Sequence, residues 1–149
     1  MNTTPPGSLI ALDVGTKTIG LAVCDALRIL ARPVSTVARK GVGKDVATML
    51  PILAEHGVVG IVVGLPLELD GAETRSCRLA RQVGDALGEA SGLPVAYQDE
   101  RFSSVEAERR LLARNMSRKK RKQTIDQAAA TVILQDFMDS VASPGFAWG

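Results

Sequence analysis

Three acidic residues stand at the ends of predicted secondary-structure elements, where they could share one chemical task. Asp13 closes the first apolar strand, Glu100 follows a strand further along the chain, and Asp126 lies near the start of the last helix. If these carboxylates converge, they present only hard oxygen ligands, with no neighbouring histidine or cysteine, which favours Mg²⁺ or Mn²⁺ over zinc. Two such ions about 3.5–4 Å apart activate a water molecule and stabilise the leaving oxygen of a phosphodiester. The pattern therefore predicts a two-metal site for phosphodiester hydrolysis, with all three acids as metal ligands and catalytic groups.

Each acid taken alone also has a structural explanation. Asp13 precedes Val-Gly and is compatible with ordinary turn chemistry. Asp126 falls in the first turn of its predicted helix, where the helix dipole favours a carboxylate. Glu100 is harder to explain in this way, because Ser103 already supplies the cap of the following helix, whereas the neighbouring Asp99 could simply cap or turn the chain. Only the joint placement of the three acids favours a metal site over these structural roles.

The basic residues are concentrated in one segment of the chain. The whole chain carries a net charge of +2, but residues 101–122 carry +7 and the remainder −5. A mildly acidic chain with one strongly basic segment is typical of a protein that binds a polyanion. We expect residues 115–123 to form a loop that holds phosphates. The predicted nucleic-acid contacts are Lys17, Arg101, Arg114, Arg118, Lys119, Lys120, Arg121 and Lys122.

Hydrophobic periodicity predicts the elements that position these residues. Five strands are expected, at residues 9–13, 19–23, 28–37, 58–64 and 94–98. Four helices are expected, at residues 45–56, 74–90, 103–114 and 124–140. The first three strands predict an antiparallel meander with Pro33 on an edge strand, whereas the wholly apolar fourth strand is typical of a buried parallel strand. The sequence thus predicts an α/β fold with a mixed five-stranded sheet flanked by helices, in one domain at 1–142 followed by a flexible tail at 143–149.

Two of the predicted helices carry further expectations. In the 45–56 helix, Pro51 should introduce a kink or shorten the helix, and Gly57 should end it. In the 124–140 helix, Asp126 shares one face with small and apolar residues, so this face should pack on the sheet and the carboxylate should need a cation. The other members of this face are Ala129, Ala130, Ile133 and Phe137.

Composition bounds the class of protein. Of the 149 residues, 46% are hydrophobic and 23% are charged, which is typical of a globular domain. The first residues contain neither a basic head nor an apolar run, so we expect no signal peptide, no membrane anchor and a cytoplasmic location. Cys24 and Cys77 lack the C-x-x-C spacing of zinc or redox motifs, so buried free thiols are expected.

Four stretches, in order and covering nearly the whole chain, resemble the YqgF (RuvX) family. They are the hairpin motif of residues 13–20, the loop of residues 64–71, the triplet Asp99-Glu100-Arg101 followed by Ser103, and the basic segment leading into Asp126-x-Ala128-Ala129. The resemblance implies a ribonuclease H-like fold and a metal-dependent nuclease, with processing of the 5′ end of pre-16S ribosomal RNA as the activity ascribed to the family. The family's acids fall on Asp13, Glu100 and Asp126. The implied partners are structured RNA and ribosomal precursor particles.

The same family is similar to RuvC-type Holliday junction resolvases, which makes cleavage of branched DNA the alternative function. Those enzymes carry two acids one helical turn apart on the last helix, whereas here the position one turn after Asp126 is Ala129. A fourth ligand is therefore absent or supplied elsewhere, which weakens the case for junction resolution. Paired junction cuts also need two active sites related by a two-fold axis, and we expect a monomer or a weak dimer.

Two other functional classes fit the sequence less well. The motif Asp-x-Gly-Thr-x-x-x-Gly, beginning at Asp13, resembles the phosphate loop of actin-like and sugar-kinase ATPases. Those proteins need a two-lobed body around the nucleotide, which one domain of this length cannot supply. A nucleic-acid-binding module without activity is the other class, and the presence of all three acids gives it little support.

Overall fold

The elements of the chain follow the predicted order. In this computed structural model the backbone is described for residues 7–68, 70–100 and 118–141, and the side chains for residues 7–68, 70–100 and 128–139. The strands are β1 (Ser8–Val14), β2 (Thr18–Cys24), β3 (Ala31–Ala38), β4 (Val58–Leu65) and β5 (Val95–Asp99). The helices are α1 (Val42–His56), α2 (Arg75–Ser91) and α4 (Arg118–Val141). The predicted 103–114 helix, Arg101, Arg114 and the predicted tail lie outside the described residues.

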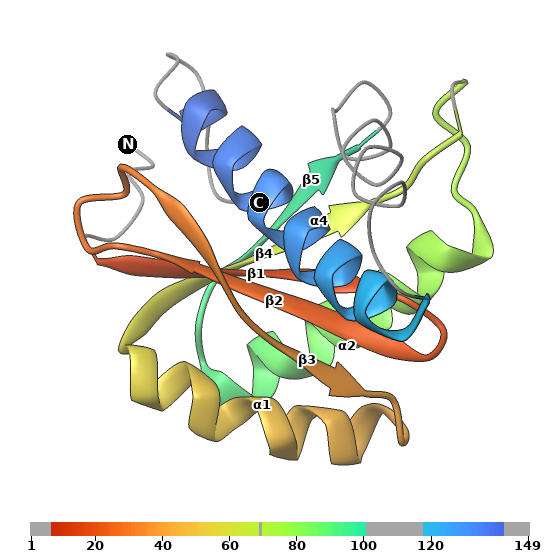
Figure 1. Ribbon diagram of the computed structural model, residues 1–149, viewed down its shortest axis with the longest axis horizontal. Helices are drawn as coiled ribbons and strands as arrows, with labels where there is room; N and C mark the ends of the chain where they lie inside the picture. Colours follow the sequence, from red (N-terminus) through yellow and green to blue (C-terminus); the bar gives the residue numbers. More distant parts are fainter. Residues whose placement is uncertain (1–6, 69, 101–117, 142–149) are drawn as a thin grey trace.

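The strands form one mixed sheet in the order β3-β2-β1-β4-β5. The pairs β1–β2 and β2–β3 are antiparallel, whereas β1–β4 and β4–β5 are parallel, so β1 lies in the centre of the sheet (Figure 1). Pro33 lies on β3, where its missing N–H costs no ladder hydrogen bond on the outer side of an edge strand. The predicted meander, the parallel strands and the edge position of Pro33 are all confirmed.

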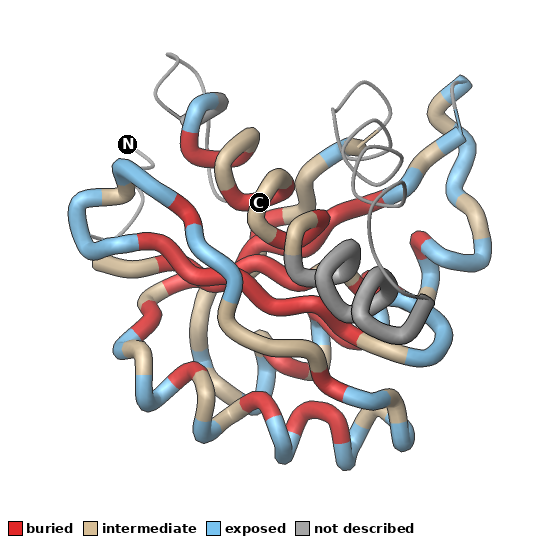
Figure 2. Tube along the Cα trace, viewed as in Figure 1, coloured by how far each residue is buried: buried red, intermediate tan, exposed pale blue. Residues whose placement is uncertain are grey.

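Helices cover both faces of the sheet, with α1 and α2 on one side and α4 on the other (Figure 1). Side chains alternate along the central strands, so Ile10 and Leu12 contact the α1–α2 layer, while Leu9 and Ala11 contact α4. Figure 2 shows that the central strands are buried along most of their length, whereas exposed residues lie on the turns and on the outer faces of the helices. The α4 face of the core is built from Ala129, Ala130, Ile133, Leu134, Phe137 and Met138.

The connection between β2 and β3 corrects the predicted start of the third strand. That strand begins at Ala31 and not at residue 28, because residues 25–28 form a turn. The Asp25 carboxylate accepts hydrogen bonds from the backbone N–H of Ile29 (2.8 Å) and Leu30 (2.9 Å), and Arg28 adopts a left-handed φ of 58°. An aspartate that binds its own downstream backbone competes with strand pairing, which explains the shift.

Helix α1 begins earlier than predicted and does not stop at its proline. It starts at Val42, runs through Pro51 and ends at His56, so the helix is not shortened, and the alternative that Pro51 kinks it stays a prediction. Gly57 follows with a left-handed φ of 58° and its N–H bonds the Ala54 carbonyl at 3.2 Å, which confirms the predicted helix end. Cys24 and Cys77 are buried free thiols, as predicted.

Helix α4 corrects the predicted state of the basic segment. The sequence predicted a loop at 115–123 and a helix start at Thr124, but α4 begins at Arg118, so Arg118 to Lys122 are helical. Arginine, lysine and glutamine are strong helix formers, and adding turns to a helix whose later part is packed avoids a new nucleation step. Thr124 therefore lies inside the helix. Among the described helices, none is long and apolar enough to cross a membrane.

Candidate functional site

Asp13 lies on the central strand in a place where the neighbouring strands carry no side chains. It is half-buried on the α4 face of β1, in line with Leu9 and Ala11. Gly20 is its partner on β2. On the other side, Leu12 pairs with Val63 in the parallel ladder, so the next residue of β4, Gly64, is the neighbour of Asp13 there. The carboxylate thus stands on the sheet between two glycines, which leave room above the backbone for a ligand or another side chain.

Glu100 occupies part of this room. Its backbone N–H donates to the Leu65 carbonyl at 3.0 Å, which holds the chain after β5 against the end of β4. A Cβ atom at Gly64 would lie 2.6 Å from Glu100 Oε2 and 2.6 Å from Ile133 Cδ1. The half-buried Glu100 carboxylate therefore lies directly over Gly64, on the strand next to Asp13. The structure brings these two predicted acids to the same face, at the carboxyl ends of β1 and β5, the two strands on either side of β4.

Asp126 is placed by the backbone of α4, and its side chain lies outside the described ones. It lies two helical turns before Ile133, the residue that contacts the Gly64 position. The Gln135 carboxamide oxygen accepts from Ala31 N–H at 3.2 Å, at the beginning of β3. From Gln135 back to the first residue of the helix, α4 extends toward the end of β3 and the β1–β2 turn (Figure 1). The Asp126 backbone, about 13 Å before Gln135 along the helix axis, thus lies toward the edge that carries Asp13.

The predicted packed face of α4 is confirmed in its described part. Ala129, Ala130, Ile133 and Phe137 are all buried, and they are 3, 4, 7 and 11 residues after Asp126. Among the side chains that the structure describes, no three acidic, histidine or cysteine residues gather into one cluster. The described part of the site is therefore a carboxylate pair, Asp13 and Glu100.

This pair suits a hard divalent cation. Carboxylate oxygens are the ligands that Mg²⁺ and Mn²⁺ prefer, and Gly64 leaves the space above β4 in which the Glu100 carboxylate lies on the strand beside Asp13. The residues present thus fit a magnesium or manganese site.

The turn that follows Asp13 is held by an ion pair that sequence analysis missed. Arg39 Nε lies 2.7 Å from Asp45 Oδ2, with 11% and 1% of the two side chains exposed. Arg39 also donates from Nη1 to the Gly15 carbonyl at 2.9 Å and from its backbone N–H to the Lys17 carbonyl at 2.8 Å. Asp45 was predicted only as the start of a helix, and no local pattern distinguishes a buried partner from an ordinary first-turn acid. The pair fixes the turn two residues beyond Asp13.

Strand β5, which leads to Glu100, is anchored on α2 by Tyr97. The Tyr97 hydroxyl donates to the Asp85 carboxylate, and the Arg81 guanidinium lies 5.0 Å from the ring centroid. Burial first, and then the hydrogen bond to Asp85, raise the pKa of Tyr97. Gly84 provides the space, because a Cβ there would lie 2.7 Å from the Tyr97 hydroxyl oxygen. An edge strand is thereby fixed in the position that Glu100 requires.

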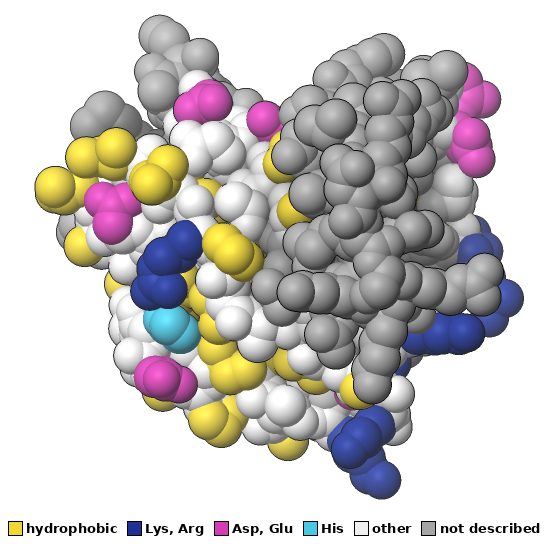
Figure 3. Space-filling view, viewed as in Figure 1, with side chains coloured by type: hydrophobic (Ala, Val, Ile, Leu, Met, Phe, Trp, Pro, Cys, Tyr) yellow, Lys and Arg dark blue, Asp and Glu magenta, His cyan; other side chains and the backbone are white. Residues whose placement is uncertain are grey.

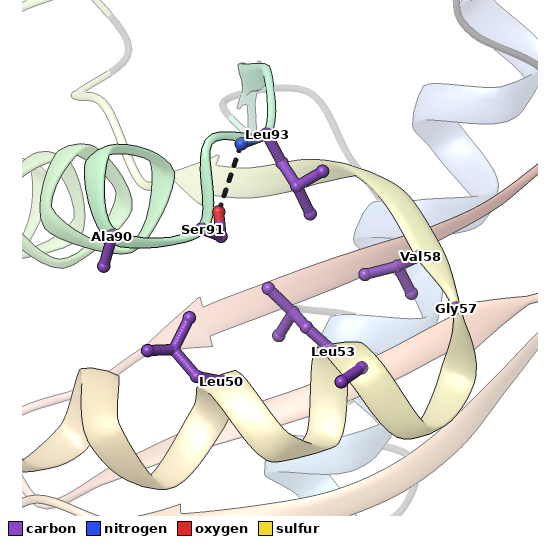
Figure 4. A pocket seen from close by; sticks show the side chains of 8 residues that line it. Leu50, Leu53, Gly57, Val58, Ala90, Ser91 and Leu93 are labelled. Atoms are coloured by element: carbon purple, nitrogen blue, oxygen red, sulfur yellow. Dashed lines mark hydrogen bonds between the residues drawn. The ribbon is translucent and has the colours of Figure 1, made fainter.

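A groove at the opposite end of the parallel strands has different chemistry. It has a volume of about 360 Å³ and lies between the ends of α1 and α2 and the starts of β4 and β5 (Figure 4). Leu50, Leu53 and Leu93 line it, and the Leu93 N–H donates to Ser91 Oγ at 3.2 Å. None of the described residues that line this groove is charged, which distinguishes its chemistry from that of the Asp13 edge.

The predicted nucleic-acid contacts are only partly described. Lys17 is exposed on the β1–β2 turn, close in sequence to Asp13. The segment from Arg118 to Lys122 forms the start of α4, with its side chains outside the described ones, and Arg101 and Arg114 lie outside the described residues altogether.

Comparison with known proteins places the chain in a family. A family model described as "RuvX: Holliday junction resolvase" matches residues 7–140. The chain belongs to the RuvX family. Relatives named "Putative pre-16S rRNA nuclease" include one from Cereibacter sphaeroides, 47% identical over 133 residues that cover 89% of this chain and 83% of the relative. Another, from Myxococcus xanthus, is 42% identical over 135 residues that cover 91% and 89%. The predicted family is confirmed.

A solved structure confirms the fold of this RuvX family member. RuvC from T. thermophilus, in complex with a Holliday junction substrate, superposes with a TM-score of 0.56 and 17% identity, covering 92% of this chain and 96% of that one. At this identity the likeness concerns the fold alone. The chain has the ribonuclease H-like α/β fold that the sequence predicted, with a single five-stranded mixed sheet.

Proposed function

We propose that this RuvX family member is a metal-dependent nuclease that hydrolyses phosphodiester bonds at Asp13, Glu100 and Asp126. The observation that carries the proposal is the position of the Glu100 carboxylate, which lies over Gly64 on the strand beside Asp13. Two half-buried carboxylates on one sheet face offer hard oxygen ligands of the kind that a divalent cation prefers. The strand between the two acids carries glycine at position 64, so no side chain there keeps the carboxylates apart. This arrangement favours a metal-binding role.

The residues of the chain would divide the work between binding and positioning. Asp13 and Glu100, with Asp126 from α4, would hold two Mg²⁺ or Mn²⁺ ions. When bound, such ions supply an activated water and stabilise the leaving oxygen. The Arg39–Asp45 pair and Tyr97 keep the two acid-bearing segments in place, and preorganised ligands lose little free energy to rearrangement during the reaction. The basic run from Arg118 to Lys122 would bind phosphates of the substrate.

The substrate we propose is the 5′ end of pre-16S ribosomal RNA. The names of relatives that are 41–47% identical over most of the chain support this choice. Structured RNA presents the dense phosphate charge that a basic segment binds, and the ribosomal precursor particle is the context in which this RNA occurs. Cleavage of a Holliday junction is the second candidate, supported by the description of the family model and by the likeness in fold to RuvC.

Substitution of the acids tests the chemistry. Asp13→Asn and Glu100→Gln should each lower the rate of Mg²⁺-dependent or Mn²⁺-dependent RNA cleavage by at least about 100-fold, because a neutral amide is a poor ligand for these ions. The matched control is Glu55→Gln, an exposed acid of α1 in the opposite layer from α4, which should cleave at the wild-type rate. An Asp13→Asn protein with undiminished activity would rule out the mechanism.

A second experiment distinguishes the two substrates. Depletion of the protein in its host should leave 16S ribosomal RNA with extended 5′ ends, and wild-type protein but not the Asp13→Asn variant should restore them. In parallel, a synthetic four-way junction should be left intact or cut without the paired symmetry of a resolvase. Symmetric paired nicks by a dimeric form, with normal ribosomal 5′ ends after depletion, would favour the junction function.

A further inference from the structure

Two lysines outside the predicted contacts lie at the same end of the sheet as the acids. Lys40 and Lys44 lie on the segment that joins β3 to α1, and both side chains are exposed. Among the side chains that the structure describes, neither lysine makes an ion pair. Lys17 is exposed on the adjacent β1–β2 turn. Figure 3 shows lysine and arginine side chains gathered along the lower right margin of the molecule, over this end of the sheet.

This corner is built as a rigid unit with the turn that follows Asp13. Asp45 binds Arg39 through one carboxylate oxygen and accepts the backbone N–H of Lys40 through the other, at 2.8 Å. Arg39 in turn bonds the carbonyls of Gly15 and Lys17. The charge of Asp45 is therefore balanced by Arg39. The backbone at Lys40 is fixed relative to β1, the strand that carries Asp13. A lysine held in this way binds an anion with a smaller loss of entropy than a lysine on a free loop.

The helix dipole does not favour the charge of Lys44. This residue lies in the first turn of α1, where the partial positive charge of the helix disfavours a cation. No described carboxylate pairs with it to offset this cost. A cation placed against the helix dipole, next to another unpaired cation, instead produces a local positive potential suited to a polyanion.

We propose that Lys40 and Lys44 bind phosphates of the nucleic-acid strand where it passes the acids and continues on the α1 side of the sheet. The inference rests on the proposed nuclease function and extends it. The start of α4 lies at this same end on the opposite face of the sheet (Figure 1), so the substrate is held from both sides of the edge that carries Asp13. The ligand is a polynucleotide that extends beyond the scissile bond.

The test compares two variants with the same change in net charge. Lys40→Gln combined with Lys44→Gln removes two positive charges at the corner. The control, Arg32→Glu, makes the same change in net charge at an exposed residue near the start of β3. This residue lies about 26 Å from Lys40 along the extended strand. The separation exceeds the screening length of about 10 Å at 0.1 M salt. Binding of the full chain to a labelled RNA hairpin and a DNA four-way junction is measured by fluorescence anisotropy with Ca²⁺ in place of Mg²⁺, over 0.05–0.4 M salt (roughly the range over which counterion release dominates).

The double lysine variant should bind about 25- to 60-fold more weakly at 0.1 M salt, and its salt slope should fall by about 1.4 to 1.8, for two lost phosphate contacts. Arg32→Glu should bind as the wild type does. In cleavage assays the double variant should raise KM and leave kcat within about twofold, since it acts on uniform binding.

The remaining outcomes separate this inference from the proposed function. Unchanged affinity and salt slope in the double variant, with wild-type binding and cleavage intact, would overturn the role of Lys40 and Lys44 alone. Equal losses in both variants would also overturn it, because the effect would then follow net charge and not position. A wild-type chain that binds neither probe would overturn the proposed function as well. Tighter binding to one probe identifies the polynucleotide, and loss of affinity for that probe in the double variant supports the inference.

Discussion

Gly64→Ala tests whether the space over β4 is what brings the Glu100 carboxylate to Asp13. The new Cβ would lie 2.6 Å from Glu100 Oε2 and 2.6 Å from Ile133 Cδ1, so both groups must move. Glu100 is half-buried at the end of a strand and can swing away, whereas Ile133 is fully buried and must repack. We expect an overpacking cost of about 1–3 kcal/mol, which for this chain length lowers Tm by about 2–10 °C.

The effect on activity should exceed the effect on stability. In the proposed mechanism Glu100 is a metal ligand, and its displacement by the width of a methyl group should lower metal affinity and activity by about 10- to 100-fold. Cleavage is measured at 25 °C, where the variant remains folded, and divalent-ion affinity is measured separately by calorimetry. Both should fall together, since the substitution acts on Glu100 and leaves Asp13 in place.

A second substitution separates the two clashes. Ile133→Val removes the Cδ1 atom that meets the new methyl group, so Gly64→Ala with Ile133→Val should recover most of the lost stability. It should not recover cleavage, because the Glu100 clash persists. If the double variant regains both stability and activity, the loss came from helix packing alone, and if Gly64→Ala cleaves at the wild-type rate, the placement of Glu100 over Gly64 has no role in the reaction.

Two further substitutions test the groups that hold the acid-bearing segments. Tyr97→Phe removes the hydrogen bond to Asp85 and should lower the free energy of unfolding by about 0.5–1.5 kcal/mol at pH 7. The pKa of Tyr97 is raised in the folded state. The stabilisation by the neutral hydroxyl is therefore fully present below a pH of about 10 and is lost as the pH rises further. Urea unfolding between pH 8 and 11 should therefore show a steeper fall in the wild type than in the variant, and parallel curves would contradict this. Asp45→Ala leaves the Arg39 guanidinium without its buried partner and should lower the free energy of unfolding by about 3–5 kcal/mol. The control Glu73→Ala breaks an exposed pair, with side chains 42% and 43% exposed, and should lower it by about 0–1 kcal/mol. Equal losses of stability in the two variants would refute a special role for the buried pair.

The sequence predicted the sheet well because its signals are local. Apolar runs predicted the five strands, Pro33 predicted that the third of them lies at an edge, and Gly57 predicted the end of α1. Boundaries were missed where a side chain competes with the expected pattern. Asp25 binds the backbone of residues 29 and 30 and delays β3, and helix-forming cations extend α4 back to Arg118.

The geometry of the site depends on contacts between segments, which local patterns do not encode. The sequence marked Asp13 and Glu100 as acids at strand ends, but it did not mark Gly64 as the position over which Glu100 lies. Nor did it distinguish Asp45, buried to 1% exposure and paired with Arg39, from an ordinary helix-starting acid. The first feature follows from strand register, since the parallel pairing of β1 with β4 decides which residue stands beside Asp13, and the second follows from the way the segment after β3 meets the first turn of α1.

The helical state of the basic run changes how its charges can act on a substrate. Successive positions of a helix advance by about 100° around its axis, so the five positions from Arg118 to Lys122 are distributed around α4. A loop could align all five with one phosphate strand, whereas a helix cannot. In the proposed binding mode, exposed cations on the other face of the sheet complement those of α4, and the rigid corner supplies Lys40 and Lys44 there. The correction to the start of α4 thus strengthens the case for binding from both sides of the edge that carries Asp13.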